Sequence, residues 1–300
     1  MMSYYSNGKL IILGEYYVLE GAKAFALPTK LGQSLEVSPI QSAVLLWKSF
    51  NADGIVWYDD EIAISDILAN NQCSENKIRN TLIAILHQAN QMNPAILTNG
   101  FSIETKLTFP RNWGLGTSST LINNIAQWFE IDAFELLNRS FGGSGYDVAC
   151  AQNNLPITYQ IKDKHPIVNQ VSFNPNFKDQ LFFVYLNQKM DSKKAIANFK
   201  NKKQYLTTEI NDVSALTDEL LQVEEIDTFI ALFKRYERDL SKVLQTPTIQ
   251  EQFFSDFDGL VKSLGGWGGD FVLVASKENP SNYFKQKGFN TILTYEEMIL

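Results

Sequence analysis

Histidine and cysteine are scarce in this 300-residue chain, which contains two of each. With only His87 and His165 there is almost no material for a histidine-ligated zinc site or a Ser-His-Asp triad. Cys73 and Cys150 do not form a C-x-x-C pair, so we expect no disulfide framework, and a reducing cytoplasm fits better. His87 follows apolar residues at helical spacing, which favours a structural or solvent-exposed role for it.

Long hydrophobic runs and an excess of positive charge are also missing from the sequence. No segment approaches the roughly 20 apolar residues that a membrane helix needs, and the first residues do not resemble a signal peptide. The formal net charge of −7 argues against nucleic acid as a partner. We therefore expect a cytoplasmic protein without nucleic-acid or membrane partners.

The apolar content, 45% of all residues, is sufficient for a packed core in one large domain or two lobes. Runs rich in β-branched and aromatic residues predict strands at 31–40, 42–50, 54–60, 100–110, 156–161 and 181–188. A 3.6-residue period predicts helices at 75–91, after Ser118, from Asp132 and in a long run between 206 and 245. Residues 262–276 are interpreted as a helix end, a four-glycine turn and an apolar strand.

The stretch GLGTSST, residues 114–120, combines glycines and hydroxyls immediately before a predicted helix. A helix N-terminus offers unpaired N–H groups and partial positive charge, and glycines let a phosphate approach the backbone. The pattern is neither a Walker A loop nor a Rossmann fingerprint. By itself it fits a phosphate loop or an ordinary turn with an N-cap.

Four stretches, taken in order, resemble the motifs of the GHMP kinase superfamily, which includes galactokinase, homoserine kinase, mevalonate kinase and phosphomevalonate kinase. They are GKLIILGEYYVLEG at 8–21, GLGTSST at 114–120, GSGYDVA at 143–149 and GGWGGDFVLV at 265–274. The third stretch, GSGYDVA, is similar to the GSGFDVA segment of phosphomevalonate kinases. It is still more similar to the corresponding segment of the GHMP branch that is named for its GYDIA string. The resemblance runs from about residue 8 to residue 275.

This resemblance implies a two-lobed α+β GHMP kinase fold and an ATP- and Mg²⁺-dependent enzyme with a small-molecule substrate, acting as a monomer or homodimer. The N-terminal lobe, 1–160, would carry the glycine-rich phosphate loop, and the C-terminal lobe, 161–300, would be ferredoxin-like.

The resemblance also implies roles for individual residues. Lys9 would stabilise charge on the transferred phosphoryl group, and Asp147 would face the acceptor hydroxyl. Without the resemblance, Lys9 would be interpreted as a solvated lysine and Asp147 as a helix cap. Nucleotide-binding residues would be Gly114, Leu115, Gly116, Thr117, Ser118 and Ser119, with Ser118 also approaching the metal. Substrate-binding residues would be Glu15, Ser144, Gly145, Ser192, Lys193, Gly266 and Gly268.

Two residues depart from the family pattern. Tyr16 replaces the histidine of the mevalonate kinase GEH string, and Trp267 replaces a small residue of the last motif. The Trp267 ring would either cover the pocket or pack beneath the loop. The only acids between residue 118 and Asp147 are Glu130, Asp132 and Glu135, and Asp132 and Glu135 fit a capping box better than a metal site. We therefore expect Ser118 and the nucleotide phosphates to carry most of the metal binding.

The acceptor is expected to belong to the mevalonate (isoprenoid precursor) pathway. Asp147 argues against homoserine kinase, and the first motif is unlike that of galactokinases. YLNQKMDSKKAI, residues 185–196, resembles a substrate segment of phosphomevalonate kinase, where Ser192, Lys193 and Lys194 would hold an anion or form a solvated helix face. This favours mevalonate or phosphomevalonate, with a slight preference for the latter. The alternatives are another small alcohol or sugar, or a catalytically silent ligand-binding protein.

Overall fold

The computed structural model describes residues 1–188, 199, 206–267 and 269–300. It has the mixed α+β architecture expected from the sequence, with two sheets among the described residues. The chain divides into two compact units, each built from separated segments. Unit 1 comprises 1–8, 31–111 and 115–152, and unit 2 comprises 9–30, 112–114 and 153–300. The continuous lobes expected at 1–160 and 161–300 stay a prediction.

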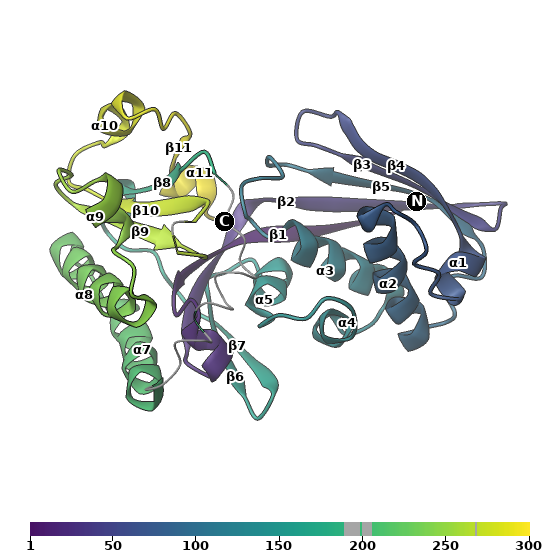
Figure 1. Cartoon of the computed structure of the whole chain (residues 1–300), viewed down its shortest axis with the longest axis horizontal. Helices are drawn as coiled ribbons and strands as arrows, with labels where there is room; N and C mark the ends of the chain where they lie inside the picture. The colour runs from purple at the N-terminus through teal and green to yellow at the C-terminus, as the bar shows by residue number, and fades with distance from the viewer. Residues whose placement is uncertain (189–198, 200–205, 268) are drawn as a thin grey trace. The chain divides into compact units, whose positions relative to one another are not determined.

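Unit 1 is a sheet covered by helices on one face (Figure 1). Its strands follow the order β4-β3-β5-β2, in which β3 and β5 are parallel and the other pairs antiparallel. The elements are β2 (Ala24–Ile40), β3 (Val44–Phe50), β4 (Val56–Ala63), α1 (Ile64–Leu68), α2 (Lys77–Met92), β5 (Gly100–Leu107), α3 (Thr117–Phe129), α4 (Ala133–Ser140) and α5 (Tyr146–Gln152). The first part of β2 belongs to unit 2.

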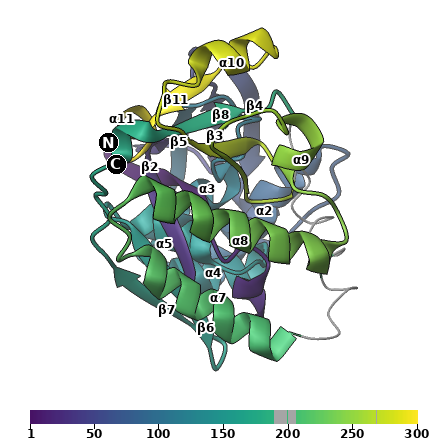
Figure 2. The same cartoon turned by 90° about the vertical axis from the view of Figure 1, so that its left-hand side faces the viewer.

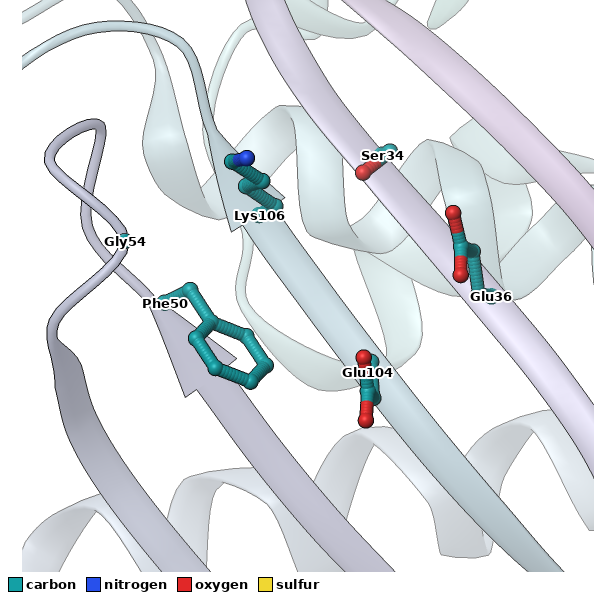
Figure 3. A pocket seen from close by; sticks show the side chains of 6 residues that line it. All are labelled: Ser34, Glu36, Phe50, Gly54, Glu104 and Lys106. Atoms are coloured by element: carbon teal, nitrogen blue, oxygen red, sulfur yellow. The ribbon is translucent and has the colours of Figure 1, made fainter.

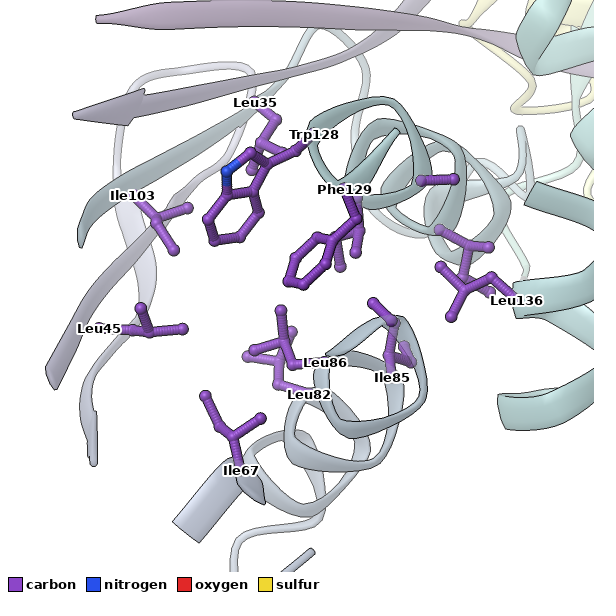
Figure 4. Packing of buried hydrophobic residues seen from close by; sticks show 14 of the residues in the cluster. Leu35, Leu45, Ile67, Leu82, Ile85, Leu86, Ile103, Trp128, Phe129 and Leu136 are labelled. Carbon is purple, nitrogen blue, oxygen red and sulfur yellow. The ribbon is translucent and has the colours of Figure 1, made fainter. Parts of the chain in front are cut away.

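The core of unit 1 lies between this sheet and α2, α3 and α4 (Figure 4). Leu35 of β2 and Ile103 of β5 are fully buried and face the helices, and Trp128 and Phe129 of α3 lie edge to face with ring centroids 4.8 Å apart. Because side chains alternate along a strand, the residues next to Leu35 and Ile103 point to the opposite face of the sheet. This packing fixes α3, the helix that follows the glycine loop.

Unit 2 contains a four-stranded antiparallel sheet of order β11-β8-β10-β9, together with the first part of β2 paired to β6. In Figure 2, α7 and α8 lie side by side. The strands are β6 (Ile157–Lys162), β7 (His165–Gln170), β8 (Leu181–Tyr185), β9 (Leu260–Leu264), β10 (Phe271–Ala275) and β11 (Ile292–Thr294). Strand β1 (Met2–Leu13) is shared between the units: its residues from Lys9 onward belong to unit 2. The helices are η1 (Tyr17–Glu20), η2 (Lys178–Gln180), α7 (Leu206–Leu220), α8 (Ile226–Leu244), α9 (Ile249–Phe253), α10 (Ser281–Gln286) and α11 (Tyr295–Met298).

Two expectations about secondary structure are wrong. Residues 260–264 are not a helix end but strand β9, which forms an antiparallel hairpin with β10. All five residues of β9 are buried, so the strand has no alternating pattern by which it could be recognised. The run between 206 and 245 is two helices, because the chain turns at 221–225 between α7 and α8. Strand β7, which contains His165, was not anticipated.

No helix in the described part of the chain is long and apolar enough to cross a membrane. His87 lies on α2, with its Nδ1 atom 2.9 Å from the backbone oxygen of Ile67, which agrees with a structural role for this residue.

Candidate active site

The second half of the glycine loop forms the start of α3. Gly116 has a φ of +94°, which favours glycine, and it precedes the helix without a side-chain cap. The first turn of α3 holds no acidic side chain of its own that would oppose the positive end of the helix dipole. The first N–H groups of a helix lack intrahelical partners, and here they follow two positive-φ glycines, Gly114 and Gly116. This is the local geometry of an anion site.

The structure separates the four hydroxyls of the loop into two kinds. Ser119 and Thr120 are buried, and Ser119 donates to the Gly116 carbonyl at 2.9 Å. Thr120 Oγ1 donates to Gln33 Oε1 on β2 at 2.7 Å, which anchors the first turn of α3 to the sheet. Thr117 is half-buried and Ser118 is exposed. Thr117 and Ser118 are therefore the hydroxyls that a ligand can reach at this helix end.

The first half of the loop is held by β8 and β10 of unit 2. Asn112 Nδ2 donates to the hydroxyl of Tyr185 at 2.8 Å, and the Trp113 ring packs edge-on against Phe271 with centroids 5.3 Å apart. A Cβ atom at Gly114 would overlap the carboxylate of Asp270, and the φ of Gly114 is +67°. Both space and backbone conformation therefore require glycine at position 114. Asp270 and Tyr185 were not anticipated as neighbours of the loop.

Helix α5 places Asp147 in unit 1, next to α3. The two helices contact each other, and the turn before α5 contains Gly142, Gly143 and Gly145, all at positive φ. Asp147 lies in the first turn and is half-buried, as is Ser144, whereas Gly145 is buried. The structure thus brings α3, the helix after the glycine loop, and α5, the helix of Asp147, together within one unit.

The first motif forms the end of β1 and a tight turn in unit 2. Lys9 lies on β1 and is half-buried. Gly14 has a φ of +95°, and a Cβ there would lie 2.8 Å from Ala24, so only glycine fits this turn. Glu15 is 4% exposed, and its carboxylate accepts hydrogen bonds from Lys262 at 2.6 Å and from Tyr236 at 3.0 Å.

The third motif connects β9 to β10. Gly265 has a φ of +75°, and Gly266 is half-buried. The indole N–H of Trp267 donates to the Pro247 carbonyl at 2.9 Å, which ties the ring to the segment after α8. Gly268, like Ser192, Lys193 and Lys194, lies outside the described residues.

The acids considered as metal ligands are engaged elsewhere. Glu130 ends α3, about 20 Å along the helix from its start at a rise of about 1.5 Å per residue. Asp132 caps α4 by accepting from the Glu135 backbone N–H at 2.7 Å, and the Glu135 carboxylate accepts from Arg139. Within residues 1–188, 199, 206–267 and 269–300, no group of three or more His, Cys, Asp or Glu could hold a metal ion. The exposed Ser118 hydroxyl remains the loop's candidate metal ligand, because hard cations bind oxygen.

A hollow of about 260 Å³ lies on the face of the unit 1 sheet that points away from the helices (Figure 3). Glu36 of β2 and Glu104 of β5 stand directly opposite each other there, near Lys106. Like charges opposite each other repel, and none of the predicted site residues lines this hollow. It is therefore not the candidate active site.

No family model matches the chain, and no curated protein matches it. Solved structures do resemble it along most of its length. The mevalonate kinase of Methanococcus jannaschii is 15% identical, with a TM-score of 0.71 and 98% of both chains covered. The Streptococcus pneumoniae phosphomevalonate kinase, in complex with phosphomevalonate and AMPPNP, is 16% identical, with a TM-score of 0.70, covering 96% of this chain and 95% of that one. The Lactococcus lactis galactokinase complexed with galactose is 10% identical, with a TM-score of 0.68 and coverages of 95% and 87%.

The fold is that of the GHMP kinases. The fold expected from the four motifs is thereby confirmed. The likeness covers 98% of the chain in the first of these structures, so it includes both sheets and the glycine loop.

The two departures from the GHMP motifs are neighbours in the structure. The backbone N–H of Trp267 donates to the Tyr16 hydroxyl at 2.6 Å. Tyr16 has a φ of +67°, an uncommon conformation for a non-glycine residue, and its ring stacks on Phe199 with centroids 5.2 Å apart. Burial raises the pKa of Tyr16 to about 12, so its hydroxyl stays protonated at neutral pH. In this chain the turns of the first and third GHMP motifs are therefore joined by a hydrogen bond.

Proposed function

We propose that this protein is an ATP-dependent small-molecule kinase. The observation that carries the proposal is the start of α3, where two positive-φ glycines precede a helix whose first turn contains no acidic residue and exposes the Ser118 hydroxyl. Backbone N–H groups in this arrangement suit a chain of phosphates. The solved phosphomevalonate kinase of similar fold was crystallised with AMPPNP, which supports ATP as the donor.

In the proposed phosphoryl transfer, a few side chains each have a separate role. ATP with Mg²⁺ supplies the γ-phosphoryl group. The loop amides and Ser118 bind the phosphates, and Lys9 balances charge that develops on the transferred group. Asp147 accepts the proton of the acceptor hydroxyl, or orients it, while the oxygen attacks phosphorus. The contact between α3 and α5 supports this division, because it keeps the loop and Asp147 in one packed unit.

We propose mevalonate or phosphomevalonate as the acceptor. The support is the GSGYDVA segment, whose Asp147 lies in the first turn of α5, together with the similar folds of a mevalonate kinase and a phosphomevalonate kinase. The test is an ADP-release assay with each compound at millimolar concentration beside galactose and homoserine. Activity on a sugar or amino acid alone would contradict the acceptor and leave the kinase standing. No ADP release, together with ligand binding, would favour the silent binding protein.

Mg-ATP is expected to raise the thermal unfolding midpoint by about 5 to 10 °C at a hundred times its Kd, because a ligand of the folded state shifts unfolding by mass action. Gly116→Val should abolish this shift, since its side chain would occupy the space of a phosphate. The measurement is differential scanning fluorimetry with and without Mg-ATP.

Gly54→Val is the matched control for this change. Gly54 also has a positive φ, +81°, with open space where a Cβ would be, and it lies in the turn between β3 and β4, outside the glycine loop. Its valine variant should lose stability and keep the ligand-induced shift. An equal shift in folded Gly116→Val would show that the loop does not hold the nucleotide.

A further inference from the structure

Three ionisable side chains are buried together inside unit 2. Lys262 of β9 is 0% exposed, Glu237 of α8 is 3% exposed and Glu15 of the first motif is 4% exposed. They come from segments that are separated in the sequence, and only the folded chain brings them together. Buried charges are costly unless they are paired, and the arrangement of protons on this cluster can therefore be deduced.

Lys262 is an ammonium ion bound to Glu15. Its Nζ donates to Glu15 Oε1 at 2.6 Å and to the Ser263 carbonyl at 2.7 Å. It also lies 5.7 Å from the ring centroid of Phe233 and 5.4 Å from that of Tyr236, where the faces of aromatic rings favour a cation. The close contact makes Glu15 the ionised partner of this lysine.

Glu237 is the second carboxyl group of the cluster. Its Oε1 lies 3.7 Å from Lys262 Nζ, beyond hydrogen-bond distance, and neither oxygen makes a hydrogen bond of normal geometry with the described residues. Burial raises the pKa of Glu237 to about 8; the charge of Glu15 adds to this rise, whereas Lys262 and the backbone N–H of Ser263 oppose it. One lysine neutralises one carboxylate, so at neutral pH Glu237 carries a proton and the cluster has no net charge.

The cluster holds the turn of the first motif. Glu15 Oε2 accepts from the Tyr236 hydroxyl at 3.0 Å, and that hydroxyl accepts from the Gly14 backbone N–H at 3.2 Å. Burial, together with the nearby charge of Glu15, raises the pKa of Tyr236 well above its usual value, so this hydroxyl keeps its proton. Both carboxylate oxygens of Glu15 are thus occupied by protein donors, and the side chain is closed to solvent.

We propose that Lys262 and protonated Glu237 are positioning residues, and that Glu15 anchors the turn after β1 instead of contacting substrate. The proposal depends on the proposed function in one respect: the turn follows the strand that carries Lys9, the residue proposed to act on the transferred phosphoryl group. Loss of the Glu237 proton would place a second negative charge beside Glu15. The groups around Glu237 are Lys262 and Ser263 of β9, Glu15 and Tyr16 of the turn, and Tyr236 of its own helix.

The sign of the pH effect follows from linkage. Between the ordinary glutamic acid pKa of 4.5 and the raised value of about 8, the folded chain holds a proton that the unfolded chain has lost. This carboxyl group therefore lowers stability as the pH rises through that window, and it adds no further change above it. Glu237→Gln imitates the protonated form at every pH. The thermal midpoint of the variant minus that of the wild type should grow from pH 5 to pH 8 and then level off.

The deciding experiment combines this pH series with infrared spectra and, where ADP release is found, with turnover. The spectra should show a protonated carboxyl band at pH 7 that disappears by pH 9 and is absent from Glu237→Gln. The ratio of variant to wild-type kcat should rise about tenfold between pH 7 and pH 9, the loss expected when only the protonated form is active and the pKa is near 8.

A constant midpoint difference, or no protonated carboxyl band at pH 7, would overturn the proposal. If Glu237→Gln does not fold, wild-type protein with ¹³C-labelled glutamate still reveals the band through its isotope shift. The stability and infrared measurements do not require turnover. A protein without kinase activity would refute the proposed function, but these two measurements would still decide whether Glu237 is protonated in the folded chain.

Discussion

Asp147→Asn is expected to lower kcat for phosphoryl transfer by about a hundredfold or more, the range usual for a general base or an orienting carboxylate. Asparagine keeps the shape of the side chain but removes its charge and most of its basicity. Mg-ATP should still raise the thermal midpoint of the variant, since Asp147 lies on α5, whereas the glycine loop proposed to bind the nucleotide leads into α3. Initial rates of ADP release, with the acceptor saturating, measure the effect.

Asp132→Asn provides the matched control for this substitution. Asp132 also begins a helix of unit 1, where it accepts from the Glu135 N–H, and asparagine caps helices equally well. Its kcat and thermal midpoint should both remain close to those of the wild type. Equal rates for Asp147→Asn and wild type would refute the assigned role even though the fold stands.

Lys262→Met is expected to lower the free energy of unfolding by about 3–5 kcal/mol, the cost of removing one partner of a buried ion pair. Methionine retains most of the volume, so the loss would come from leaving the ionised Glu15 without a cation. Urea unfolding, followed by tryptophan fluorescence, measures this change. Combining the substitution with Glu15→Gln should restore part of the lost stability, because two neutral partners leave no unpaired charge.

The control for this change is Lys277→Met, which removes an exposed ion pair. Lys277 lies 2.8 Å from Asp227, with side-chain exposures of 63% and 73%. Solvent screens exposed ion pairs, which therefore contribute little to stability, so the unfolding midpoint should hardly move. Similar losses in the two lysine variants would show that burial of Lys262 carries no special cost.

The elements that follow local rules could be predicted from the sequence. Helix α3 shows a 3.6-residue apolar period after a glycine turn, and the structure begins it at Thr117. Strand β5 alternates, and its exposed and buried residues follow that alternation. The glycine turn before α5 was also visible, because consecutive glycines that adopt positive φ leave a local signature.

The elements that depend on distant partners could not be predicted. Strand β9 has a lysine in the middle of five residues, which suggests a polar face until its partner on the first motif is known. Glu15 and Lys262 are 247 residues apart, and no periodicity connects them. For the same reason Asp270 was not recognised as the neighbour of Gly114. One indication of such a partner was present in the sequence, the charged Lys262 inside an otherwise largely apolar strand.

Unit 2 is built from three separated segments of the chain, and this limits how the protein can be divided into fragments. A fragment of residues 153–300 would lack 9–30 and 112–114, and with them the strand that pairs with β6 and the partner of Asp270. It would also expose Lys262 without its counter-ion. Chimeras with other GHMP-fold proteins should therefore exchange all three segments together.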